Sequence, residues 1–160
     1  MQNFTIRRAK QSDLATVGKL GASLVQAHFA FDPQRFIAPG PKAAEGYASF
    51  LRGQLREETA VIFVAERDGA LAGYVYAELE PHSWKELRAA SGFIHDVVVD
   101  PSHQGIGIGT ALVEAASAWL RDHGAPRVIL FTAEQNNAAQ RLFSRLGFRR
   151  TMIEMTRELT

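Results

Sequence analysis

One segment constrains the fold of this chain more than any other: a short apolar strand that runs into a glycine-rich turn and then a helix. Residues 93–99 read Phe-Ile-His-Asp-Val-Val-Val, which is typical of a strand inside a sheet. Asp100-Pro101 ends that strand, and a helical pattern follows from about Gly107 to His123. The turn between them carries glycine at the alternate positions 105, 107 and 109. This strand–turn–helix unit indicates an α/β domain.

The remaining pattern predicts a mixed sheet with helices on both faces. Strands are expected over 4–8, 60–65, 71–79, 93–99, 127–131 and 148–157, and helices over 12–29, 42–57, 107–123 and 136–146. Ser12 is expected to cap the first helix, and Asp68-Gly69 predicts a tight hairpin turn. We therefore expect a single α/β domain over residues 1–160.

The composition excludes several kinds of site and partner. None of the 160 residues is a cysteine, which excludes a cysteine nucleophile and a thiolate zinc site and fits a reducing compartment. The 18 basic and 17 acidic residues lack the basic excess of nucleic-acid binders. Apolar runs such as 60–65 are too short to cross a bilayer, and the first residues lack the apolar core of a secretory signal. We expect a soluble, cytoplasmic protein with no nucleic-acid or membrane partner.

The glycine-rich turn is suited to bind an anion. Glycine has no Cβ, so the backbone can approach a ligand closely, and N–H groups at a helix N-terminus favour a pyrophosphate. The alternative is tight helix–sheet packing without a ligand. Two other phosphate motifs fit poorly. A P-loop ends in Gly-Lys-Ser/Thr, and this turn has no lysine. A dinucleotide fingerprint needs glycine where this turn has Thr110.

Two spaced motifs carry a family resemblance. Residues 104–109, Gln-Gly-Ile-Gly-Ile-Gly, resemble the Gln/Arg-x-x-Gly-x-Gly/Ala acetyl-CoA signature of the GNAT superfamily of N-acetyltransferases. Residues 136–148 resemble its second motif, Asn-x-x-Ala-x-x-Phe-Tyr-x-x-x-Gly-Phe, and residues 6–14 resemble its first strand and helix. The resemblance covers almost the whole chain. It implies a mixed central sheet of six or seven strands, in which the parallel strands 94–99 and 127–131 splay apart.

The resemblance also implies an activity and a cofactor site. The expected reaction is transfer of an acetyl group from acetyl-CoA to a primary amine of a small molecule, an amino acid or a protein N-terminus, within a ternary complex. Backbone groups near Val97 and Val99 would bond the pantetheine arm, and an N–H of Val97 or Val98 would stabilise the oxyanion. Residues 104–110 would hold the pyrophosphate, and Asn136 would bond the arm unless it only caps its helix. The expected cofactor-binding residues are Val97, Val98, Val99, Gln104, Gly105, Ile106, Gly107, Ile108, Gly109, Thr110, Asn136, Ala139, Leu142 and Phe143.

Two side chains of the central strand are candidates for the catalytic base. His95 and Asp96 stand where some family members carry Glu-Asp, and an ordinary histidine can accept a proton near neutral pH. Strand alternation places His95 on the face of Phe93 and Asp96 on the face of Ile94, so only one is expected to face the acetyl group. The alternatives are a hydrogen-bonded core histidine and a buried structural carboxylate.

The chain departs from the family at Phe143. Many members have a tyrosine there, which protonates the departing thiolate, and phenylalanine cannot donate a proton. Either another group takes over, with Tyr74 and Tyr76 as candidates, or the thiolate leaves unprotonated. The departure keeps open a second function, a non-catalytic CoA-binding regulatory or interaction module of the same fold.

The resemblance places the acceptor between the first two helices and the loop 81–91. The candidate acceptor residues there are His28, Phe31, Phe36, Glu80 and Trp84, which could equally form a local core. Glu78, Glu80 and Glu86 are too few to identify an acidic pocket. No residues stand at metal-ligand spacing, so we expect no metal. Weak alternation over 152–159 could pair with a second subunit and form a homodimer.

Overall fold

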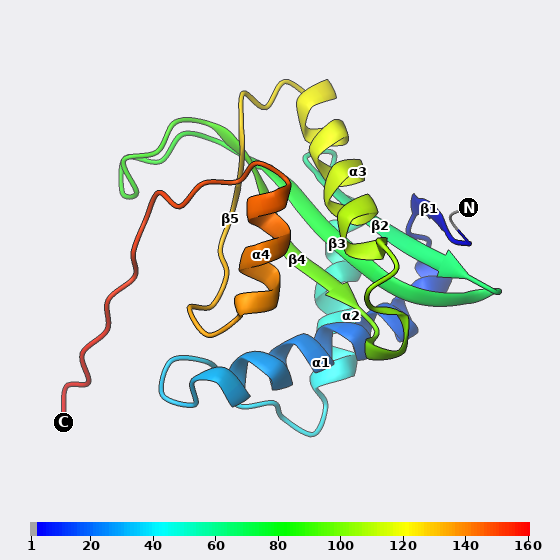
Figure 1. Cartoon of the computed structure of the whole chain (residues 1–160), viewed down its shortest axis with the longest axis horizontal. Coiled ribbons are helices and arrows are strands. Elements are labelled where there is room, and N and C mark those ends of the chain that lie inside the picture. The colour runs from blue at the N-terminus through cyan, green and yellow to red at the C-terminus, as the bar shows by residue number, and fades with distance from the viewer. Residues whose placement is uncertain (1–2) are drawn as a thin grey trace.

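A five-stranded sheet with the strand order β1-β2-β3-β4-β5 lies at the centre of the computed structural model (Figure 1). The structure describes residues 3–160, so residues 1 and 2 of the predicted domain lie outside the described residues. The strands are β1 (Thr5–Arg8), β2 (Ala60–Arg67), β3 (Ala70–Glu80), β4 (Ser91–Val99) and β5 (Val128–Leu130). The helices are α1 (Leu14–Phe31), α2 (Ala43–Gln54), α3 (Ile108–Asp122) and α4 (Asn137–Arg145). Neighbouring strands are antiparallel except β4 and β5, which are parallel.

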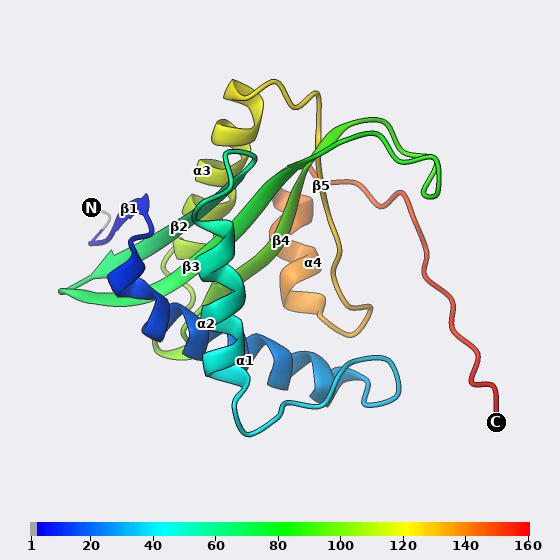
Figure 2. The same ribbon diagram turned by 180° about the vertical axis from the view of Figure 1, so that it is seen from behind.

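Helices cover both faces of the sheet, as predicted. α1 and α2 lie on one face, and α3 lies on the other (Figure 2). Alternation along β2 assigns the side chains to the two faces. Val61 and Ala65 belong to the core under α3, whereas Ile62 and Val64 belong to the core under α1 and α2.

Among residues 3–160, no helix is both long enough and apolar enough to cross a membrane. The cytoplasmic location stays a prediction.

The parallel strands β4 and β5 separate soon after they meet, which confirms the predicted splayed pair. Their pairing joins Gly92 to Val128 and ends where Ile94 pairs with Leu130. Within the described chain, residues 95–99 have no strand partner on that edge. The backbone of β4 beyond Ile94 is therefore available to a ligand with the hydrogen-bonding pattern of a strand.

β4 contains a β-bulge at His95. Tyr76 pairs with Asp96, while the next residue of β3, Ala77, pairs with Ile94. His95 is therefore the extra residue of the bulged strand, and period-2 alternation fails at this point.

The bulge brings His95 and Asp96 to the same face of the sheet. The ring of His95 stacks on Tyr76, with centroids 5.1 Å apart, and Asp96 accepts a hydrogen bond from Tyr74. Both tyrosines belong to the core under α1 and α2, whereas Ile94 belongs to the core under α3. The prediction that His95 and Asp96 face opposite sides is therefore wrong.

Two further predictions about element boundaries are wrong. The sheet has five strands rather than six or seven, because residues 148–157 form no strand. From residue 149 onward every side chain is exposed, so no buried apolar surface holds this segment to the sheet edge.

The first helix is not capped by Ser12. Asp13 instead closes the turn, where its carboxylate accepts the backbone N–H of Lys10 at 2.7 Å, and α1 begins at Leu14. Pairing of residues 152–159 with a second subunit stays a prediction.

Candidate active site

The turn after β4 presents a row of backbone N–H groups without acceptors. Gly105 and Gly107 have φ angles of +81° and +93°, a region that side chains rarely allow. A Cβ at either position would meet open space, so backbone conformation rather than crowding requires glycine. In the described part of the chain, no acceptor is found for the backbone N–H groups of residues 105–110. These donors gather at the positive end of the α3 dipole, which is the arrangement an anion site needs.

Side chains of the same segment hold the turn in place. The Gln104 amide donates to the carbonyl of Val99 at 3.2 Å, and Ile108 is buried in the core. A Cβ on Gly109 would lie 3.3 Å from Leu142, so this glycine lets α3 approach α4. The side chain of Ile106 is exposed on the turn, and that of Thr110 is exposed in the first turn of α3. Of the residues predicted to bind the pyrophosphate, Gln104 and Ile108 therefore hold the turn in place, while the backbone N–H groups face outward.

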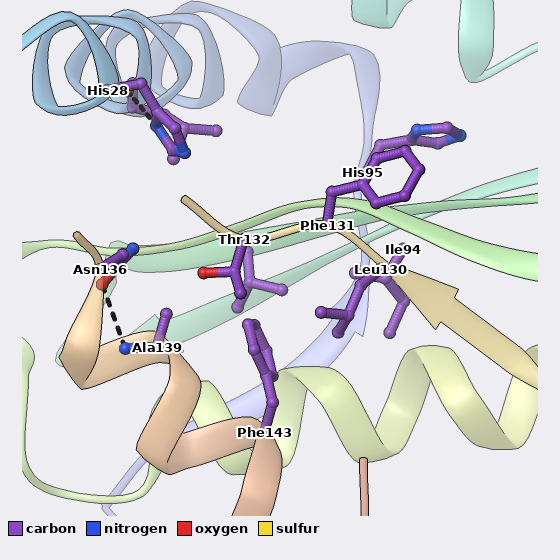
Figure 3. A pocket seen from close by; sticks show the side chains of 11 residues that line it. His28, Ile94, His95, Leu130, Phe131, Thr132, Asn136, Ala139 and Phe143 are labelled. Atoms are coloured by element: carbon purple, nitrogen blue, oxygen red, sulfur yellow. Dashed lines mark hydrogen bonds between the residues drawn. The ribbon is translucent and has the colours of Figure 1, made fainter. Parts of the chain in front are cut away.

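A narrow pocket opens where β4 and β5 diverge (Figure 3). Its volume is about 60 Å³. Four parts of the chain line it: Leu24 and His28 of α1, Ile94, His95 and Val97 of β4, Leu130, Phe131 and Thr132 at the end of β5, and Asn136, Ala139 and Phe143 at α4. The structure thus brings five predicted site residues of β4 and α4 to one place. Val98 instead belongs to the core under α1 and α2, and Val99 packs toward α3.

Asn136 caps α4, which was the alternative to a ligand-binding role. Its Oδ1 accepts the backbone N–H of Ala139 at 3.1 Å (Figure 3). Among residues 3–160 no acceptor is found for its Nδ2 group, and the residue also lines the narrow pocket. Capping and ligand binding are therefore compatible.

A larger cavity of about 430 Å³ lies on the other side of His95. Its lining comes from Tyr47, Phe50 and Gln54 of α2, Tyr76 and Glu78 of β3, and His95 and Asp96 of β4. His95 lines both cavities, so it stands between them. Sequence reasoning did not assign the α2 residues to the site. Their spacing of three and seven residues places them on one helix face, but only the fold shows what that face meets.

Asp96 is held at the base of this cavity by two tyrosines. Its Oδ2 accepts the hydroxyls of Tyr47 at 2.7 Å and Tyr74 at 3.0 Å. Gly21 of α1 makes room for the ring of Tyr47, because a Cβ there would overlap it. Burial raises the pKa of the Asp96 carboxyl above its usual range, although both hydroxyls oppose this shift. Tyr74 is fully buried and committed to Asp96, which argues against it as the proton donor to a thiolate.

His95 is exposed rather than a core histidine. Its ring stacks between Tyr76 and Phe93, with centroid distances of 5.1 and 4.9 Å. Its Nε2 lies 3.2 Å from a carboxylate oxygen of Glu80 and 3.5 Å from one of Glu78. The ring is therefore oriented by aromatic stacking while one nitrogen faces carboxylates.

Sequence spacing did not reveal this cluster of carboxylates. Donor atoms of Glu78, Glu80 and His95 lie within 4.8 Å of one another, a grouping that could also hold a metal ion. The three residues lie on two strands, and only the register of β3 against β4 brings them together. The absence of a metal therefore stays a prediction. Glu86 is not part of the cluster, because it pairs with Arg88 at 2.9 Å.

The predicted acceptor residues do not form one site. His28 packs edge-to-face against Phe31 and Phe36, with centroids 5.9 and 4.9 Å away, at the C-terminal end of α1. Glu80 joins His95 instead. Trp84 is 83% exposed and lines neither cavity.

Sequence comparisons match this chain to known acetyltransferases. Residues 25–148 match the Acetyltransferase (GNAT) family. Mycothiol acetyltransferases from Cellulomonas flavigena and Thermomonospora curvata are 36% and 38% identical over 127 and 124 residues, in each case 76% of this chain. The matches cover 36% and 39% of those relatives, so this chain spans little more than a third of their length.

Solved structures share the fold. A variant of the BH1408 protein from Bacillus halodurans has a TM-score of 0.83 at 22% identity, covering 98% of this chain and 99% of that one. The aminoglycoside N-acetyltransferase AAC(6')-Iy in complex with CoA has a TM-score of 0.75 at 18% identity, covering 98% and 94%.

Proposed function

Because this chain belongs to the acetyltransferase (GNAT) family, we propose that it transfers the acetyl group of acetyl-CoA to a primary amine of a small molecule, an amino acid or a protein N-terminus. The observation that carries the proposal is the row of N–H groups at 105–110, which have no acceptor in the described chain. A diphosphate supplies the acceptors they lack. The CoA complex of a solved structure with this fold supports the choice of anion.

The proposed path of acetyl-CoA follows the splayed strands. The pyrophosphate binds the turn, and the pantetheine arm runs along β4 beyond Ile94, where the strand has no partner on that edge within the described residues. The acetyl group then lies in the narrow pocket beside Val97 and His95. Asn136 offers its Nδ2 group to the arm, and the apolar wall is made by Ala139 and Phe143.

The chemistry requires one proton acceptor and one oxyanion donor. The amine nitrogen attacks the thioester carbonyl, a C–N bond forms, and the carbonyl oxygen becomes an oxyanion. A backbone N–H of Val97 or Val98 stabilises that charge. His95 accepts the proton that the nitrogen loses, and the C–S bond breaks to release CoA thiolate. Phe143 has no proton to give, so the thiolate takes one from water.

The acceptor amine binds in the larger cavity. It meets the narrow pocket at His95, so an amine that enters from it approaches the thioester past the imidazole. Two substrates can then bind together, as direct transfer requires.

Turnover with a panel of amines tests the proposal. We expect thiol release from acetyl-CoA with at least one class among small amines, amino acids and peptides. CoA binding without release in any class would favour the non-catalytic module. Failure to bind CoA in a titration would contradict any acyl-CoA function.

The two roles of Asn136 can be separated by substitution. Aspartate caps a helix about as well as asparagine, so we expect Asn136→Asp to keep the melting temperature. It lacks the amide donor, so the KM for acetyl-CoA should rise by about three- to tenfold. Asn136→Ala should lose the cap as well, at about 1 kcal/mol of stability. A normal KM in the aspartate variant would leave Asn136 with capping alone.

A further inference from the structure

The larger cavity has a lining that favours positive charge. It carries the carboxylates of Glu78 and Asp96, and no lysine or arginine of the described chain lines it. The adjacent Glu80 is balanced by Arg88, whose Nη2 lies 2.8 Å from its carboxylate. Glu78 has no such partner among the described residues, and its Oε2 accepts the hydroxyl of Tyr76 at 2.8 Å. A carboxylate in this setting attracts a cation.

The aromatic rings that line this cavity favour an organic ammonium group over a bare metal ion. Tyr47 and Phe50 pack edge-to-face at 6.1 Å, and Phe50 and Tyr76 do so at 5.8 Å. Phe50 is 50% exposed, an unusual amount for a large apolar ring at a cavity. Ring faces attract organic ammonium groups through their quadrupoles. A cavity of about 430 Å³ also exceeds the needs of a bare metal ion.

Asp96 offers the cavity a second carboxylate oxygen that can accept a hydrogen bond. Asp96 as a whole residue is only 7% exposed, and both tyrosine hydroxyls donate to the same oxygen, Oδ2. In the part of the chain that the structure describes, no hydrogen-bond donor is found for Oδ1. Oδ1 is not among the described buried side-chain atoms that lack a partner, so it is open to the cavity, where an ammonium N–H can donate to it.

We propose that this cavity binds a second ammonium group of the acceptor, so that the acceptor is a diamine or a larger polycation. This rests on the proposed function, which places the reacting amine at His95. The distal ammonium then lies beside Glu78, enclosed by the aromatic rings. A distal carboxylate would meet Glu78 with like charge, so an amino acid is a poor fit.

Binding to the CoA-loaded full chain tests the proposal without requiring turnover. The probes are α,ω-diaminopentane, aminopentane and aminopentanoic acid, each titrated calorimetrically. We expect the diamine to bind about tenfold more tightly, or better, than either other probe. Glu78→Gln keeps an acceptor for Tyr76 but loses the charge, so it should erase that preference. Glu86→Gln is the matched control, because Glu86 pairs with Arg88 outside the cavity and its loss should leave the preference intact.

Each contrary outcome has a distinct meaning. Equal binding of diamine and aminopentane, or a diamine preference that survives Glu78→Gln, would overturn the proposal. Binding of Zn²⁺ alone, abolished by Glu78→Gln, with no diamine binding would overturn it in favour of a metal site. Tight diamine binding without thiol release would keep this subsite and refute the proposed acetyl transfer. Thiol release that is equally fast with aminopentane and with the diamine would support acetyl transfer and refute this subsite.

Discussion

CoA binding is expected to be lost when Gly107 is replaced by glutamate. The φ angle of +93° would be strained, and the new carboxylate would stand among the N–H groups proposed to hold the diphosphate. A like charge about 4 Å from a phosphate costs roughly 4 kcal/mol at an effective dielectric constant near 20. That corresponds to about a thousandfold in affinity, which a calorimetric titration of CoA would register as no detectable binding.

Two variants separate charge from backbone strain. Gly107→Ala has the same φ without the charge, so we expect it to weaken CoA binding much less. Gly124→Glu adds the same side chain at a φ of +88°, also into open space, at the opposite end of α3. We expect it to bind CoA normally once its folding has been checked by melting temperature. Wild-type affinity in Gly107→Glu, or an equal loss in Gly124→Glu, would contradict the placement of the diphosphate.

His95→Ala should lower kcat by about a hundredfold or more, because general-base catalysis contributes about that much. The imidazole stands between the two cavities and is stacked on Tyr76 and Phe93, so it is oriented as well as close. The KM for acetyl-CoA should change little, since the proposed diphosphate site lies elsewhere. The pH–rate profile should lose the limb that reports deprotonation of the base.

A second histidine provides the control for this variant. His123 stacks on Trp119 with centroids 4.1 Å apart at the C-terminal end of α3, away from both cavities. We expect His123→Ala to change stability without changing the shape of the pH–rate profile. If His95→Ala retains the wild-type profile, the base is another group and the role of His95 is structural.

The turn was predictable because its signals are local, whereas the splayed pair was expected only from the family resemblance. Glycine at 105 and 107 marks positive φ within one short segment, and Asp100-Pro101 marks the strand end directly. The motif that includes Asn136 similarly predicted where α4 begins, since N-capping involves only three residues.

The arrangement of the cavity walls was not predictable, because it depends on pairing between segments far apart in sequence. The bulge at His95 follows from the register of β3 against β4, and alternation alone gives the wrong face. The contact between Tyr47 and Asp96 joins residues 49 positions apart. Glu78 had no sequence signal that linked it to either residue. The strand expected over 148–157 failed for the same reason, since its alternation is weak and no neighbour buries it.

One imidazole, that of His95, lines both the cavity of about 60 Å³ and the cavity of about 430 Å³. In the proposed reaction the smaller cavity holds the two-carbon acyl group, and replacing this side chain by a smaller one would widen the cavity for longer acyl chains and for water together. If acetyl-CoA binds as proposed, acyl-length discrimination and the rate of thioester hydrolysis both depend on the His95 side chain, so a substitution there should change the two together.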